Sequence, residues 1–138
     1  MDIKASLGYV LNESGGAPFA QGFYQLLFRD YPELRRHFEQ TDLAVQQIIL
    51  TNSLIVVVAF MEYRSKTISK YLELIGHRHA LRGIPHEDYP KFHASMLGHL
   101  KDYLGDQWTD RLHAAWDEAL SEALAVIQQG HEPGAGRY

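Results

Sequence analysis

Hydrophobic residues recur along most of the chain at intervals of three and four positions, the spacing that places side chains on one face of an α-helix. The longest such pattern covers residues 41–64, and either Thr41 or Asp42 can cap the start of this helix. Because the pattern keeps a helical period, we interpret the β-branched run Ile55–Phe60 within it as helix and not as strand. The stripe comprises Leu43, Gln46, Leu50, Leu54, Val57 and Met61.

Shorter helical patterns lie on both sides of this stripe. Gly83 and Pro85 separate two of them, and Gly130 is predicted to end the last. No stretch alternates convincingly enough between apolar and polar residues to indicate a sheet, so the predicted fold class is all-α, with about six to eight helices. The predicted helices cover residues 3–12, 18–31, 32–38 (a short turn), 41–64, 67–81, a stretch after Pro85, and 109–129.

Length and composition indicate an ordinary globular protein. A chain of 138 residues is most simply one domain, which we place at residues 1–129, followed by a flexible tail at 130–138. The net charge is -4 and the basic residues are scattered, which argues against a nucleic-acid partner. The chain has no cysteine, and this excludes disulfides, thiolate catalysis, iron–sulfur clusters and cysteine-ligated heme.

Neither the N-terminus nor the most apolar run of the chain indicates a membrane partner. The N-terminus lacks the basic and then apolar pattern of a signal peptide. The most apolar run, Leu54 to Met61, is far shorter than the roughly 20 residues that span a bilayer. We therefore expect a soluble, cytoplasmic protein.

His79 has the most informative position in the pattern. It stands four positions after Ile75, so it continues the apolar face of the helix predicted over 67–81, just before the break at Gly83. An imidazole at the end of an apolar face can hold a group in a pocket, and if that group is heme, His79 is its axial ligand. The alternative, a core or partly exposed histidine, is the commoner role of a single histidine. The eight histidines lack the paired spacing of a zinc site.

Two polar residues interrupt apolar stripes elsewhere, Tyr24 in the helix over 18–31 and Gln46 in the helix over 41–64. A buried amide without a partner costs roughly 1–3 kcal/mol, so each needs a hydrogen bond. Together with His79 they form a consistent set, in which both donate to a ligand held on the far side of the pocket. The alternative is that they bond to backbone or to each other in an ordinary core. Phe38 likewise has a core-packing interpretation.

Taken in order and with their spacings, these residues resemble bacterial single-domain globins and the globin domain of flavohemoglobins. The resemblance covers nearly the whole chain, from about residue 5 to 129. It implies a globin fold around a heme pocket. The matching segments are residues 23–28 with Pro32 and Phe38, residues 74–79 with Gly83, Ile84 and Tyr89, and residues 115–119.

The resemblance implies a role for each matched residue. His79 takes the place of the proximal heme ligand, and Tyr24 takes that of the distal tyrosine. Gln46 takes the place of the distal glutamine, although the loop before it varies in length and Gln47 is the alternative. Arg78 stands where relatives often carry a basic residue near a heme propionate, and its alternative is an ordinary solvated arginine. The implied heme contacts are Phe38, Leu50, Leu54, Arg78, His79, Ile84 and Phe92.

One position departs from the pattern of flavohemoglobins. There, a glutamate late in the last helix joins the proximal histidine and a tyrosine that corresponds to Tyr89. The corresponding place falls near His131, with Glu132 next to it. This departure weakens the case for the strong electronic push that such a carboxylate gives to the iron.

The resemblance implies a heme-binding globin that reversibly binds dioxygen and other diatomic gases, with heme b as cofactor because no Cys-x-x-Cys-His motif is present. One alternative is a nitric oxide dioxygenase that uses an external reductase, because the chain ends at Tyr138 without a reductase domain. A second is a gas-sensor domain with an output partner, and a third is a globin fold that binds no heme. The sequence leaves open whether the protein is an enzyme, its gas preference and its oligomeric state.

Overall fold

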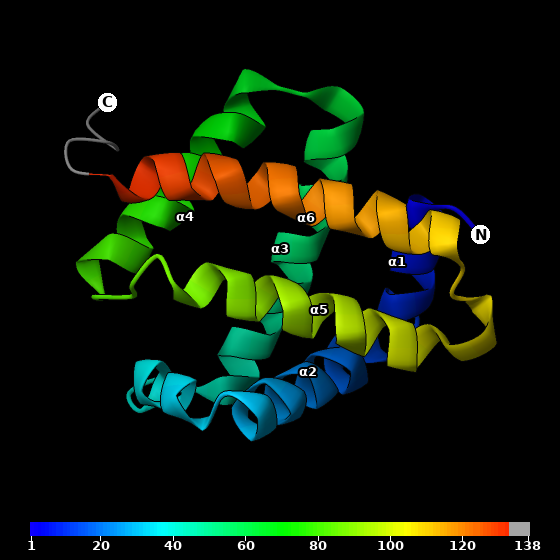
Figure 1. Cartoon of the computed structure of the whole chain (residues 1–138), viewed down its shortest axis with the longest axis horizontal. Coiled ribbons are helices and arrows are strands. Elements are labelled where there is room, and N and C mark those ends of the chain that lie inside the picture. Colours follow the sequence, from blue (N-terminus) through cyan, green and yellow to red (C-terminus); the bar gives the residue numbers. More distant parts are fainter. Residues whose placement is uncertain (133–138) are drawn as a thin grey trace.

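The computed structural model describes residues 1–132, and Figure 1 shows helices joined by short loops. Within these residues there is no strand, so the all-α prediction is confirmed. The part of the predicted tail beyond residue 132 lies outside the described residues. The α-helices are α1 (Ile3–Leu11), α2 (Ala17–Asp30), α3 (Leu43–Tyr63), α4 (Lys66–Leu81), α5 (Asp88–Leu104) and α6 (Asp110–His131), and the 3₁₀ helices are η1 (Ser14–Gly16), η2 (Pro32–Phe38) and η3 (Gly105–Gln107).

Side-chain caps determine where four of these helices start, and the first is Asp2, whose carboxylate accepts a hydrogen bond from the backbone N–H of Ala5 at the start of α1. The carboxylate of Asp42, and not Thr41, caps α3 by accepting a hydrogen bond from the backbone N–H of Ala44 at 2.9 Å. The hydroxyl groups of Ser65 and Thr109 cap α4 and α6 in the same way. Each cap satisfies a backbone donor that has no partner within the first helical turn.

The helices stack in layers around one core. In Figure 1, α6 and α5 run side by side across the front, α2 lies below them, and α3 crosses behind. Their apolar faces meet in the middle of the molecule, where the largest side chains are fully buried. These include Phe19 and Phe23 of α2, Met96 and Leu100 of α5, and Trp116 of α6.

The last helix continues through Gly130 and ends at His131, so the prediction that Gly130 ends it is wrong. The reason is the close packing of α6 on α4. A Cβ atom on Gly130 would stand 1.8 Å from the carbonyl oxygen of Glu73, and one on Gly76 would stand 1.7 Å from that of Ile127. The two glycines therefore let the backbones of α4 and α6 touch where the helices cross.

The apolar character of α3 extends well beyond the run Leu54–Met61 considered above. Among the described helices, α3 is the one long and apolar enough to cross a membrane by length and composition, with a mean hydropathy of 2.0. The run Leu54–Met61 is shorter than the apolar helix because polar but uncharged residues interrupt the first half of α3. Core helices of soluble proteins have similar compositions, and α3 packs here against α1, α2, α4 and α6.

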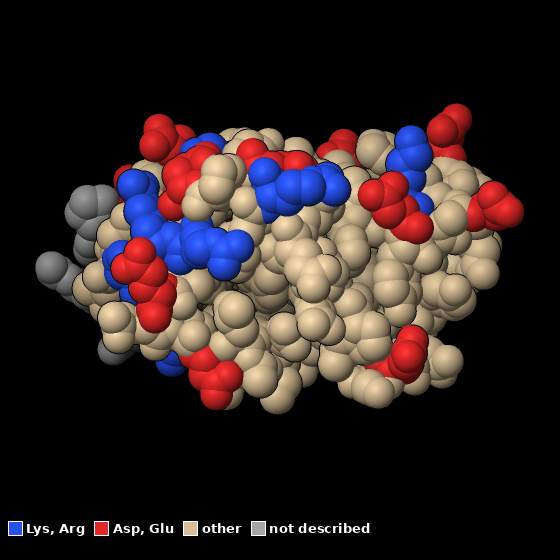
Figure 2. Space-filling model, turned by 90° about the horizontal axis from the view of Figure 1, so that it is seen from below, with Lys and Arg blue, Asp and Glu red and all other residues tan. Residues whose placement is uncertain are grey.

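Charged side chains of both signs are interspersed on the face formed around α2. Figure 2 shows this face, with Lys and Arg next to Asp and Glu at its upper left and a largely uncharged centre. Pairing of opposite charges also occurs at Lys91, which lies 3.0 Å from Asp88 and 3.4 Å from Glu33. This face therefore lacks the continuous basic area typical of nucleic-acid binding.

Candidate functional site

A cavity of about 590 Å³ lies between α3 and α4 and is closed by α2, η2, α5 and α6. This volume is in the range of about 300–1,000 Å³ typical of cofactor and ligand sites. Most of the lining is aliphatic or aromatic, with a few polar groups. All nine residues predicted to contact heme or its ligand line this one cavity: Tyr24, Phe38, Gln46, Leu50, Leu54, Arg78, His79, Ile84 and Phe92.

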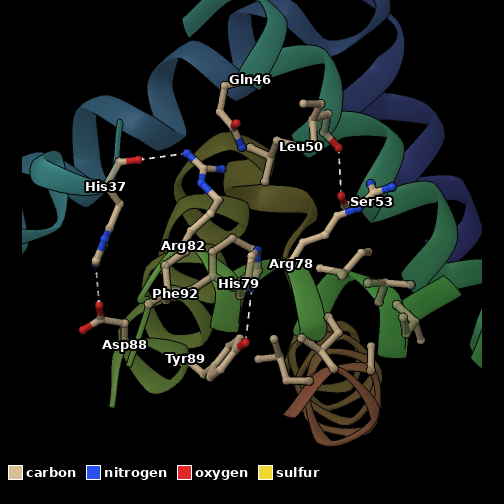
Figure 3. A pocket seen from close by; sticks show the side chains of 18 of the residues that line it. His37, Gln46, Leu50, Ser53, Arg78, His79, Arg82, Asp88, Tyr89 and Phe92 are labelled. Carbon is tan, nitrogen blue, oxygen red and sulfur yellow. Dashed lines mark hydrogen bonds and ion pairs between the residues drawn. The ribbon is translucent and has the colours of Figure 1, made fainter. Parts of the chain in front are cut away.

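His79 extends from the last turn of α4 into the cavity (Figure 3). Its partial burial lowers the pKa of the imidazole to about 4, and the nearby charges of Arg82, His131 and His37 add to this effect. The ring is therefore neutral around pH 7. A neutral imidazole has the free lone pair that a metal ligand needs.

The turn after α4 holds His79 at the cavity. Gly83 has a φ of +75°, in the left-handed region that favours glycine. The backbone N–H of Ile84 then donates to the carbonyl of His79 at 3.1 Å, which turns the chain back so that the Ile84 side chain lines the same cavity.

A hydrogen-bonded chain behind His79 connects α4, α5 and α6. Nδ1 of His79 lies 3.2 Å from the hydroxyl of Tyr89, which lies 3.1 Å from Nδ1 of His131. Since Nδ1 of His79 is engaged, Nε2 is the ring nitrogen left for a metal. Beyond, the rings of His131 and His86 lie 4.2 Å apart, and Nε2 of His86 lies 3.0 Å from the carboxylate of Glu132. Burial and His86 lower the pKa of His131, while Glu132 opposes the shift.

On the opposite wall, Nε2 of Gln46 donates to the hydroxyl oxygen of Tyr24 at 3.0 Å. Among the described residues this is the one hydrogen bond of that hydroxyl, so its own O–H remains available to donate into the cavity. Burial raises the pKa of Tyr24 to about 12, with Gln46 opposing the shift, so the group stays protonated and a donor. The neighbouring Gln47 does not line the cavity, which favours Gln46 over this alternative.

Two arginines flank His79 at the mouth of the cavity, Arg78 of α4 on one side and Arg82, which directly follows α4, on the other (Figure 3). The guanidinium of Arg82 donates to the carbonyl of His37 at 3.0 Å and to the hydroxyl of Thr41 at 3.2 Å. Arg82 was not among the predicted site residues. Its position three residues after His79, on the same side of the helix, was the signal that could have identified it.

A largely buried hydrogen bond between His37 and Asp88 lies at the same mouth of the cavity. Nε2 of His37 lies 2.9 Å from the carboxylate of Asp88, and both side chains are nearly inaccessible to solvent. Burial alone would raise the pKa of Asp88, but hydrogen bonds from His37 and Lys91 outweigh it and hold the pKa below its ordinary value. The pair connects η2 to α5. Sequence reasoning had no signal for it, because the partners are 51 positions apart.

The donor set fits heme better than a bare metal ion. Among the described residues, no group of three His, Cys, Asp or Glu side chains is placed to hold a metal. Heme needs one axial imidazole from the protein because its macrocycle supplies four ligands. The apolar walls suit the faces of the macrocycle, and the guanidinium groups at the mouth suit its carboxylates.

Comparisons with known proteins agree with this interpretation. A family model described as Globin matches residues 21–127. The chain is 33% identical over 133 residues to a flavohemoprotein of Rhizobium meliloti, covering 95% of this chain and 32% of that protein. It is 35% identical over 112 residues to one of Bacillus subtilis, covering 78% and 28%. It is 34% identical over 119 residues to one of Oceanobacillus iheyensis, covering 85% and 29%. The chain thus spans about a third of the length of these relatives, and it belongs to the globin family.

Proposed function

We propose that this heme-binding globin holds heme b through His79 and reversibly binds dioxygen, nitric oxide and carbon monoxide. The observation that carries the proposal is the placement of a neutral imidazole on one wall of the cavity and a protonated Tyr24 hydroxyl on the other. Heme supplies an iron at which diatomic gases bind. The protein supplies one axial ligand, a largely apolar cavity and a hydrogen-bond donor.

On the proximal side, the hydrogen bonds that link His79 to Tyr89 and Tyr89 to His131 set the orientation of the axial ligand. If Nε2 of His79 faces the metal, Nδ1–H donates to the oxygen of Tyr89, and the Tyr89 hydroxyl donates to His131. Second-sphere bonds of this kind fix the tautomer and the ring angle of a ligating histidine. His131 in its neutral form accepts this hydrogen bond without the negative charge of a carboxylate.

On the distal side, the Tyr24 hydroxyl would donate to a gas ligand that gains negative charge on binding. Such a donor is already oriented, because the bond from Gln46 and the surrounding aromatic rings restrict Tyr24. A preorganised donor in a cavity with little water stabilises developing charge more than a mobile one does. Gln46 therefore acts through Tyr24, and it polarises the hydroxyl by donating to it.

At the mouth, Arg78 and Arg82 would pair with the carboxylates of heme. Arg82 already donates to the carbonyl of His37 and to Thr41, so its guanidinium is held at the rim. We include in the proposal the soluble, cytoplasmic location expected from the sequence, since one side of α3, the one membrane-compatible helix of residues 1–132, packs against α1, α2, α4 and α6.

The alternative activity is nitric oxide dioxygenation, in which nitric oxide, dioxygen and one electron form nitrate. The similarity to flavohemoproteins is the reason to consider this activity. The neutral hydrogen-bond acceptor His131, however, favours reversible gas binding over catalytic turnover. Repeated consumption of nitric oxide with an added reductase would support the enzyme. A single turnover would support the binding protein.

The experiment that tests the proposal is visible spectroscopy of the purified protein in its oxidised, reduced and carbon monoxide-treated reduced forms. We expect a Soret band that shifts with carbon monoxide, and its loss or strong alteration in His79→Ala. His77→Ala is a matched control, because His77 is on the same helix but does not line the cavity. A colourless wild type that fails to take up added heme, or equal spectra of the two variants, would contradict the proposal.

A further inference from the structure

Helix α3 exposes more large apolar side chains than any other described element, most of them on the side away from the cavity, although Ile49 among them also lines the cavity. Of the ten exposed large hydrophobic residues within residues 1–132, six belong to this helix. Ile48 is the most exposed of its aliphatic side chains, at 60%. The six residues are Leu43, Val45, Ile48, Ile49, Ile55 and Tyr63.

No charged residue interrupts α3 from Leu43 to Met61. Surface helices of soluble proteins normally carry charged residues on the side away from the core, and a helix that is apolar on every side is usually covered on every side. The inner side of α3 contacts α1, α2, α4 and α6, whereas its outer side is open to solvent. An uncharged exposed face of this length is typical of an interaction surface.

The spacing on this face indicates what covers it. Val45, Ile48, Asn52, Ile55 and Ala59 follow one another at steps of three, four, three and four, which is the heptad spacing of helices that pair with other helices. The exposed stripe has an asparagine at its centre and β-branched residues on both sides. A single asparagine in such a stripe typically sets the register between paired helices.

We propose that a second copy of this chain docks on the stripe, with the two α3 helices antiparallel about a two-fold axis at Asn52. The stripe is close to symmetric around Asn52, so Ile48 of one copy would meet Ile55 of the other, and Val45 would meet Ala59. A carboxamide both donates and accepts, so the two Asn52 side chains can bond to each other across the axis. Such a self-complementary patch is what a two-fold dimer requires.

A lipid surface fits the stripe less well than a second copy does. Helices that lie on membranes carry Lys and Arg beside the apolar face, to contact anionic headgroups. α3 has no basic residue, and the nearest one after it, Arg64, is paired with Glu122. The net charge of the chain is -4, which further disfavours anionic lipid.

The size of the stripe predicts a weak, reversible dimer. The stripe from Val45 to Ala59 is about 22 Å long and about 10–12 Å wide, or roughly 220–270 Å² per copy. Stable complexes bury about 800 Å² per partner. We therefore expect dimerisation in the micromolar range or weaker, visible as a molar mass that rises with protein concentration.

Cross-linking tests the position of the axis. The chain has no cysteine, so Asn52→Cys introduces a single thiol, and Ala114→Cys introduces one on the exposed side of α6 as the control. Because a disulfide needs Cα atoms about 4.4–6.8 Å apart, we expect Asn52→Cys to form a disulfide-linked dimer at least about tenfold faster than the control under mild oxidation. Equal rates would overturn the proposal.

Sedimentation velocity over a range of concentrations tests the surface itself. We expect the wild type and the control Ala114→Asp to associate, and Ile48→Asp to remain monomeric with an unchanged helical circular dichroism spectrum. Asn52→Asp, which places two like charges at the axis, should also dissociate the dimer. A wild type that stays monomeric at all concentrations would overturn the proposal. So would binding to vesicles of phosphatidylcholine and phosphatidylserine that Ile48→Asp abolishes, because that result would identify a lipid surface as the partner.

Discussion

Tyr24 and Gln46 face the same cavity, and Gln46 donates to Tyr24 and leaves the tyrosine proton available for the gas ligand that we propose. Tyr24→Phe removes that proton and should raise the dioxygen off-rate about tenfold for each ~1.4 kcal/mol lost. Gln46→Leu should have a smaller effect, since the hydroxyl remains. Stopped-flow displacement of dioxygen by carbon monoxide measures both rates. An unchanged off-rate in Tyr24→Phe would remove this residue from its proposed role.

His131 is linked to His79 through the hydroxyl of Tyr89, and we expect this link to influence the electron density of the axial imidazole. His131→Glu would end the chain in a carboxylate, and charge-assisted bonds are about twice as strong as neutral ones. The axial imidazole should then gain negative character, which favours ferric iron and lowers the heme reduction potential. Each tenfold change in relative stabilisation corresponds to about 59 mV.

Spectroelectrochemical titration measures that potential, and His131→Gln is the control because it keeps an acceptor without a charge. The iron–histidine stretching frequency should rise in His131→Glu and change little in His131→Gln. Identical potentials and frequencies in the two variants would show that His131 has no electronic influence on the site.

At the scale of elements, the crossing of α4 and α6 depends on two glycines. Gly76→Ala would place a Cβ atom 1.7 Å from the carbonyl oxygen of Ile127, so the two backbones must separate. We expect the free energy of unfolding to fall by at least the ~1–3 kcal/mol typical of overpacking. Urea denaturation measures the change.

Gly98→Ala provides the matched control for this prediction. Gly98 is also within a helix, α5, but a Cβ atom there would meet nothing within 4 Å. Alanine in a helix is favoured over glycine by roughly 0.5–1 kcal/mol, so this variant should be as stable as the wild type or slightly more so. Equal stability of Gly76→Ala and Gly98→Ala would contradict the close crossing.

At the scale of the whole molecule, burial of His79 makes the stability of the heme-free protein depend on pH. In the unfolded chain the imidazole of His79 is protonated as the pH falls below its ordinary pKa of 6.5. In the folded protein it is protonated only below a pKa of about 4. The unfolded state therefore binds more protons between these values, and the free energy of unfolding should fall as the pH drops from 6.5 to about 4. His99 and His131, whose pKa values burial also lowers, act in the same direction.

Urea unfolding of the heme-free protein at several pH values measures this dependence. His79→Gln should make it shallower between pH 6.5 and 4. The lowered pKa of Asp88 acts in a separate window, because its contribution is present above the ordinary value of 3.8 and is lost only as the pH falls below it. The same slope in the wild type and in His79→Gln would show that the imidazole is not buried in the folded protein.

Much of the architecture could be predicted from the sequence, because it depends on neighbouring residues. A helical stripe repeats within four positions, and a cap acts within three. Neighbouring residues are therefore enough to predict the helices and the cap of α6 at Thr109. The placement of His79, Tyr24 and Gln46 on inward faces follows from the same periodicity, and all three line one cavity. What they bind was implied by the resemblance to globins and not by spacing alone.

Tertiary structure alone decided the contacts between distant segments. Gly130 has the local features of a helix end, yet α6 continues through it, because its missing side chain allows Glu73 of another helix to approach. The hydrogen bond between His37 and Asp88 likewise joins residues 51 positions apart. The sequence by itself determined which side chains face inward, since that depends on local period. Which of them touch was decided only by the folded chain, because helices far apart in sequence must first pack together.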